Sequence, residues 1–107
     1  MRVHAEALGE HARATAARAQ EDARRHMAEA RVQMRNGAEQ MRKGAEQMRV
    51  ESVRLRDPAY RAEQIVKNRE RGHEVTDAEL AALAPRLAEQ ADDLERQADD
   101  LARQSED

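Results

Sequence analysis

The sequence contains no cysteine, tryptophan or phenylalanine, and Tyr60 is its single aromatic residue. Without cysteine, the chain has no disulfide, no thiolate nucleophile and no Cys-ligated zinc site. Large side chains supply most of the stabilisation of a thick core, and very few are present. Alanine and leucine are sufficient for thin seams between helices, so these absences favour paired helices over a globular domain.

Long apolar runs are also missing, because no stretch approaches the roughly 18 residues of a membrane span. The first twenty residues are rich in Arg and Ala but lack the apolar region of a secretory signal, and their Glu residues argue against a transit peptide. We therefore expect no membrane insertion and a soluble, cytoplasmic protein. A periplasmic location, or the tail of a membrane protein, is the alternative.

Charge is abundant but unevenly distributed along the 107 residues, which carry a net charge of −3. Residues 1–56 hold 12 basic and 8 acidic side chains, whereas residues 74–107 hold 3 basic and 11 acidic ones. A basic first half and an acidic final third predict attraction between the two, within one chain or between chains.

Small and apolar residues recur at steps of four and three from Met41 to Val66, which is a heptad seam. Its members are Met41, Ala45, Met48, Ser52, Leu55, Ala59, Ala62 and Val66. The phase is kept across Pro58, so we interpret Pro58 as a kink inside a long helix that ends near residue 71. A complete break there, with Asp57 as N-cap and three helices in all, is the alternative.

A turn is predicted at residues 72–76 and a further helix at residues 77–104. Gly72 suits the left-handed position after a helix, and Thr76 with Glu79 forms a capping-box pattern. Pro85 predicts a kink near the first two turns of this helix. Its stripe is Leu80, Ala84, Leu87, Ala91, Leu94, Ala98 and Leu101.

These elements predict an all-α fold, in which a long kinked helix folds back on a C-terminal helix as an antiparallel coiled-coil hairpin. Folding at His73 places residues whose numbers sum to 146 opposite one another, for example Leu94 opposite Ser52. Residues 39–107 form this hairpin, and residues 1–38 form an unpaired helical arm. The predicted interaction seam comprises Met34, Met41, Met48, Leu55, Val66, Leu80, Leu87, Leu94 and Leu101.

The arm has a stripe of its own, spaced mostly by steps of four, four and three, which is typical of a straight helix rather than a left-handed coil. Its members are Leu8, Ala12, Ala16, Ala19, Ala23, Met27, Ala30, Met34, Ala38 and Met41. A lone helix gains most of its stability from packing, so the arm requires a partner. We expect a homo-oligomer, or another helical protein bound through residues 1–38.

Methionine and histidine are the candidate metal ligands. Met27, Met34, Met41 and Met48 lie seven residues apart, which is about 10 Å along a helix and too far for two to share one ion. None of His4, His11, His26 and His73 forms a pair at the i, i+4 spacing. We therefore predict no cofactor and interpret the methionines as seam residues. A metal or stress sensor that combines His and Met from two chains is the alternative function.

The charged clusters have ordinary interpretations. The pairs Asp92-Asp93 and Asp99-Asp100 fall on the outer face of the leucine stripe, which predicts a solvated surface. The basic residues of the first half are interspersed with Glu and lack aromatic neighbours, which argues against nucleic acid, although a nucleic-acid-associated coiled coil is a further alternative. No nucleophile–base set or phosphate loop is present, so we predict no enzymatic activity.

The stretch "QMRNGAEQMRKGAEQMR", residues 33–49, repeats every seven residues. Its Met and Ala residues lie on the seam. Gly37 and Gly44 lie beside them, where the missing side chain permits close backbone approach at about 1 kcal/mol each in helix propensity. We interpret the repeat as a packed seam.

The string "MRNGAEQMRKGAEQMR … LRDPAYRAEQIVKNRERGHEVTDAEL" resembles the Ala/Met/Glu/Arg-rich helical tails of alphaproteobacterial membrane zinc metallopeptidases of the β-lactam-sensor type, over residues 30–104. The zinc-binding His-Glu-x-x-His motif of that family is absent, so no catalytic residue is carried over. The resemblance implies an accessory helical segment of a longer protein. Our leading hypothesis is a non-enzymatic helical interaction module.

Overall fold

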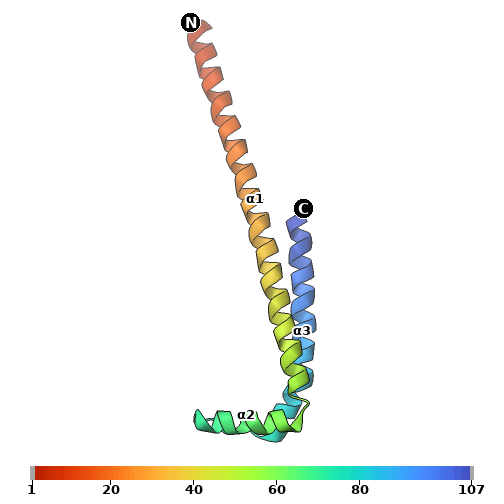
Figure 1. Ribbon diagram of the computed structural model, residues 1–107. Coiled ribbons are helices and arrows are strands. Elements are labelled where there is room, and N and C mark those ends of the chain that lie inside the picture. The colour runs from red at the N-terminus through yellow and green to blue at the C-terminus, as the bar shows by residue number, and fades with distance from the viewer. Residues whose placement is uncertain (1, 107) are drawn as a thin grey trace.

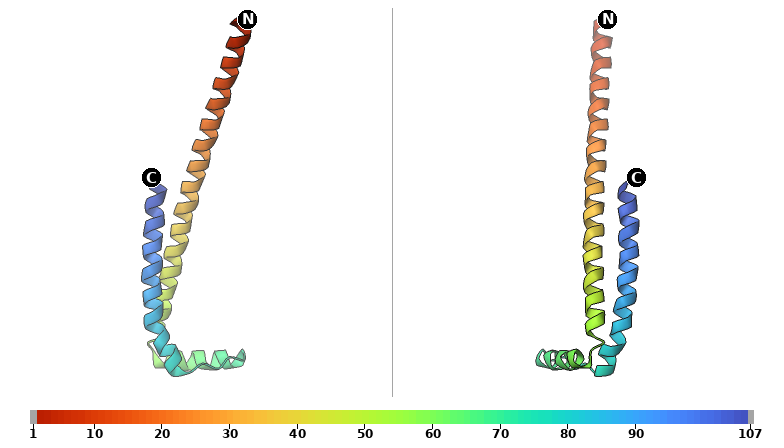
Figure 2. Two further views of the ribbon diagram at one scale, coloured as in Figure 1. Left: turned by 180° about the vertical axis from the view of Figure 1, so that it is seen from behind. Right: turned by 45° about the vertical axis from the view of Figure 1, so that its right-hand side comes forward.

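The computed structural model describes the backbone of residues 2–106 and the side chains of residues 7–106, and it consists of three helices. Helix α1 spans Arg2–Arg54, α2 spans Pro58–Glu70, and α3 spans Asp77–Glu106. Helices α1 and α3 lie side by side and antiparallel, α2 lies across their foot, and the N-terminal part of α1 extends far beyond the end of α3 (Figures 1 and 2). The predicted helical hairpin with a protruding arm is confirmed.

The molecule is elongated, with extents of 87 × 28 × 14 Å. Its radius of gyration is 26.3 Å, whereas a compact domain of this length has a radius of about 13 Å. One long helix without a complete partner accounts for the difference.

The chain breaks between α1 and α2, so the kink predicted at Pro58 is wrong and the three-helix alternative is correct. Pro58 lacks an N–H group, and its ring disfavours a helical conformation at Asp57, which is extended with φ −84° and ψ 117°. The Asp57 carboxylate accepts a hydrogen bond from the Ala59 N–H at 3.0 Å and caps α2. The end of α1 tightens into i→i−3 bonds, such as Asp57 N–H to the Arg54 carbonyl at 3.0 Å.

The turn between α2 and α3 follows the prediction closely. Gly72 has φ +82°, and the His73 N–H donates to the Asn68 carbonyl at 2.8 Å, while the Gly72 N–H donates to the Arg69 carbonyl at 3.0 Å. These two bonds form a Schellman motif, which ends α2. The Thr76 hydroxyl then accepts from the Glu79 N–H at 3.1 Å and caps α3.

The elbow at the foot of the hairpin has the only core cluster of large side chains among the described residues. Leu55 and Leu80 are 2% and 8% exposed, and partly buried residues pack around them: Tyr60, Ile65, Val75 and Leu87. Arg61 joins the three segments, because its Nη1 donates to the Leu55 carbonyl at 2.9 Å and its Nε donates to Asp77 at 2.7 Å. This bridge positions α2 across the hairpin.

Tyr60 packs in the same elbow, and its hydroxyl donates to the Glu51 carboxylate at 2.8 Å. This hydrogen bond, with a smaller contribution from burial, raises the pKa of Tyr60 above its ordinary value. The hydrogen bond between Tyr60 and Glu51 therefore stabilises the folded state fully below the unfolded-state pKa of tyrosine. This contribution is lost as the pH rises through the folded-state pKa of Tyr60.

We expect Glu51→Gln to lower the pKa of Tyr60 toward the ordinary value, because an amide oxygen accepts a weaker hydrogen bond than a carboxylate and carries no negative charge. Absorbance at 295 nm during an alkaline titration measures this directly, since the chain has no second tyrosine. Glu46→Gln is the control and should leave the titration of Tyr60 unchanged, because Glu46 is exposed and lies five residues before Glu51 on the same helix. Identical titrations for wild type and Glu51→Gln would contradict the assigned cause.

Candidate interaction surface

Helices α1 and α3 meet through small residues at heptad spacing. On α1 these are Ala38, Ala45 and Ser52, and on α3 they are Ala84, Ala91 and Ala98, all at most 3% exposed. The Ser52 hydroxyl donates to the Ala84 carbonyl at 2.6 Å. This hydrogen bond fixes the register of α1 against α3. Stepping seven residues in opposite directions from that bond places Ala45 opposite Ala91 and Ala38 opposite Ala98.

Two glycines of the seven-residue repeat lie directly under leucines of α3. A Cβ atom at Gly37 would meet Leu101 Cδ2 at 3.1 Å, and one at Gly44 would meet Leu94 Cδ2 at 3.3 Å. Both distances are tighter than ordinary contacts, so a Cβ atom at either position would require the leucine above it to shift by a few tenths of an ångström, and the glycines avoid this crowding. The predicted role of these glycines in close approach is confirmed by this geometry.

The predicted register is wrong by eight to ten residues. Folding at His73 placed Leu94 opposite Ser52 and Leu101 opposite Ala45, whereas Leu94 lies at Gly44 and Leu101 at Gly37. The reason is the break at Pro58, because α2 leaves the hairpin and α3 starts directly below the end of α1. The paired part of α1 consequently reaches back to Ala30, beyond the boundary proposed at residue 38.

The structure brings most of the predicted seam residues together. Leu55 and Leu80 are buried, and six others are half-buried along the α1–α3 contact: Met34, Met41, Met48, Leu87, Leu94 and Leu101. Val66 is the exception. It is 53% exposed on α2, because the break at Pro58 removes its helix from the seam.

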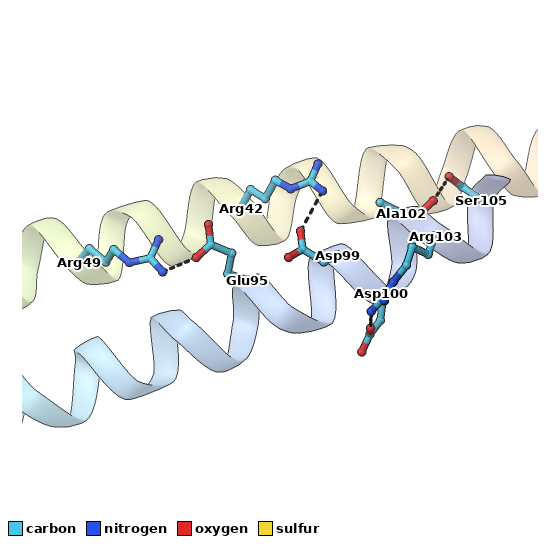
Figure 3. A network of polar contacts seen from close by, with 8 residues as sticks. All are labelled: Arg42, Arg49, Glu95, Asp99, Asp100, Ala102, Arg103 and Ser105. Atoms are coloured by element: carbon cyan, nitrogen blue, oxygen red, sulfur yellow. Dashed lines mark hydrogen bonds and ion pairs between the residues drawn. The ribbon is translucent and has the colours of Figure 1, made fainter.

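One edge of the hairpin carries arginines of α1 against carboxylates of α3 (Figure 3). Arg42 contacts Asp99 at 3.2 Å, and Arg49 contacts Asp92 at 3.0 Å and also pairs with Glu95. The hydrogen bonds that Arg49 donates to Glu95 and Asp92 raise the pKa of Arg49. Because these pairs are largely exposed, they set orientation and register more than stability.

The two aspartates of each pair therefore lie on different faces of α3, so the prediction that both lie on the outer face is wrong. Asp92 and Asp99 lie at the interface with α1, because the register shift brings Arg49 and Arg42 beside them. Asp93 and Asp100 do lie outside and pair with arginines of α3 itself. The sequence carried a signal for the interface pairs, since Arg42, Arg49, Asp92 and Asp99 all keep the seven-residue interval.

The arm is exposed over most of its described length. Every residue from 10 to 29 is exposed, and Leu8 and Met27 are 58% and 56% exposed. The arm stripe lies on the same side of α1 as the buried residues Ala38 and Ala45, because a straight helix turns 100° per residue. The face that α3 covers thus continues, uncovered, along the arm.

A hollow marks the place where α3 ends on this face. It is lined by Met27, Ala30, Arg31, Met34 and Gln104. Four of these residues belong to α1, and three of them are apolar. The hollow leads from the buried seam onto the exposed stripe.

Candidate metal ligands are not brought together within the described side chains, which hold no group of three or more His, Asp or Glu residues in metal-binding proximity. His11 and His26 lie 15 residues apart on α1, about 22 Å along the axis. His73 lies in the turn, and the side chain of His4 lies outside the described residues. His26 is 3.9 Å from Glu29 on its own helix.

The chain has no match among protein-family models, curated proteins or solved structures. Within the described part of the chain, no helix combines the length and the apolar character that crossing a bilayer requires. The arrangement of the residues is therefore the basis for assigning a function.

Proposed function

We propose that this chain is a non-enzymatic helical interaction module, in which the hairpin holds the arm and the arm pairs with another helix. The module acts alone or as an accessory region of a larger protein. The observation that carries the proposal is the continuity of one helix face, which is buried under α3 from Ala38 to Ser52 and exposed from Leu8 to Met27.

The physical argument is that an isolated helix is marginal in water, whereas the same stripe packed against a second helix is stable. The arm carries no buried residue of its own among residues 10–29. Its exposed stripe has the small-residue character that allows close approach in the hairpin. A partner helix therefore gains the type of contact that α3 makes with the lower part of α1.

Photo-crosslinking in the native cells tests the proposal. A photoreactive amino acid at Ala16 or Ala23 lies on the stripe, whereas one at Ala14 or Ala28 lies on the opposite face of the same helix. We expect crosslinked products from the two stripe positions and few or none from the two control positions. Equal crosslinking from both faces, or none from either, would contradict the proposal.

A further inference from the structure

We infer that the occupant of the arm is the arm of a second copy of this chain, running antiparallel to the first. The inference rests on the proposed function and names its partner. Three features carry it: the continuity of the exposed stripe with the α1–α3 interface, the position at which α3 ends, and the spacing of the stripe itself.

The end of α3 determines the direction of the second helix. A parallel copy that covered the stripe would carry its own residues beyond 30 along the face already occupied by α3 of the first copy. An antiparallel copy instead carries its own residues beyond 30 away from α3, and it places its Leu8 beside Met27 and the hollow. The seam of the hairpin and the seam between the copies then form one continuous line along α1.

The spacing of the stripe is self-complementary, as a two-fold interface requires. With the two-fold axis between residues 17 and 18, each residue faces the one whose number completes a sum of 35. Leu8 then faces the partner's Met27, Ala12 faces the partner's Ala23, and Ala16 faces the partner's Ala19.

The alternative registers are less favourable. A shift of one 11-residue repeat toward α3 places the partner's Leu8 opposite Ala38, which α3 already buries. The opposite shift places the partner's Leu8 opposite Ala16, so Leu8 and Met27 no longer meet. The register that sums to 35 therefore pairs the whole exposed stripe from Leu8 to Met27 with itself.

The largest exposed apolar side chains of the arm meet on this register. Leu8 of each copy lies against the partner's Met27, beside the hollow at the end of α3. The seam is otherwise alanine, and so small an apolar interface predicts a dissociation constant of roughly micromolar magnitude.

Cysteine crosslinking tests the direction and register, because the chain has no native cysteine. We expect a mixture of the Ala12→Cys and Ala23→Cys variants to form disulfide-linked dimers under mild oxidation. Each variant alone should form few, because equivalent residues lie 11 positions from register, about 16 Å along the axis. A mixture of Ala14→Cys and Ala28→Cys, on the outer face, is the control. Self-crosslinking of Ala12→Cys as strong as that of the mixture would overturn the antiparallel register.

Sedimentation equilibrium tests the self-association. Across a concentration series that reaches several hundred micromolar, the wild-type chain should dimerise, and Ala16→Glu should raise the dissociation constant about tenfold or more by placing two carboxylates beside the two-fold axis. Ala14→Glu should behave as wild type. A monomeric wild type at that concentration would overturn the inference. The proposed function would survive that result if the stripe positions crosslinked in cells to a different protein, and it would fall if they did not.

Discussion

Replacing Leu55 by alanine should lower the free energy of unfolding by about 2–4 kcal/mol. Leu55 is the largest side chain that is almost fully buried, at 2% exposure, and it lies where α1, α2 and α3 meet. Truncation leaves a cavity that cannot collapse easily, because Arg61 binds both the Leu55 carbonyl and Asp77. Urea denaturation followed by circular dichroism at 222 nm measures the change.

Val53→Ala is the matched control for this experiment. Val53 lies two residues earlier and is 62% exposed, so its truncation should change the free energy of unfolding by less than about 0.5 kcal/mol. A Leu55→Ala variant as stable as Val53→Ala would show that the elbow cluster does not stabilise the hairpin.

The second large effect is expected from Ala91→Leu, which should destabilise the hairpin by about 3 kcal/mol. Ala91 is 0% exposed, at the middle of the α1–α3 seam. Three additional carbon atoms there force the helices apart. The same displacement removes the close contacts of Leu94 with Gly44 and of Leu101 with Gly37.

Ala82→Leu provides the control, because Ala82 is exposed on the same helix and the substitution has nearly the same effect on helix propensity. Denaturation curves should separate the two leucine variants clearly. Amide hydrogen exchange should show a loss of protection along residues 84–98 in Ala91→Leu alone. Equal stability of the two variants would mean that the helices do not approach closely at Ala91.

Local chemistry explains which parts of the fold could be predicted from sequence. Gly72 and Thr76 define the turn through backbone requirements that few other residues meet, so the turn and the start of α3 agree with the structure. The buried positions on α1 and α3 also followed from periodicity. The break at Pro58 did not, because the phase of a stripe can persist through a change in chain direction. The Asp57 N-cap starts a new helix after the break, and a capping residue leaves no trace in the spacing of the apolar residues.

The register of α1 against α3 and the exposure of Val66 both depend on the break at Pro58. Small and apolar residues that recur every three and four positions offer several similar pairings, so the sequence pattern alone does not choose among them. The arm was predictable because residues 1–29 exceed the length that α3 can cover. Its occupant was not, because alanine at regular spacing accepts many helices, and only the position of the α3 terminus restricts the choice.

The small-residue seam also determines how the protein responds to temperature. The buried hydrophobic residues of the described chain are Leu55, Leu80 and five alanines, so unfolding exposes little apolar surface for a chain of this length. Since the heat capacity of unfolding rises with exposed apolar area, its value per residue falls below the roughly 12–15 cal/mol/K of compact domains. A small heat-capacity change flattens the stability curve, so the hairpin loses less stability on cooling than a globular domain of equal melting temperature.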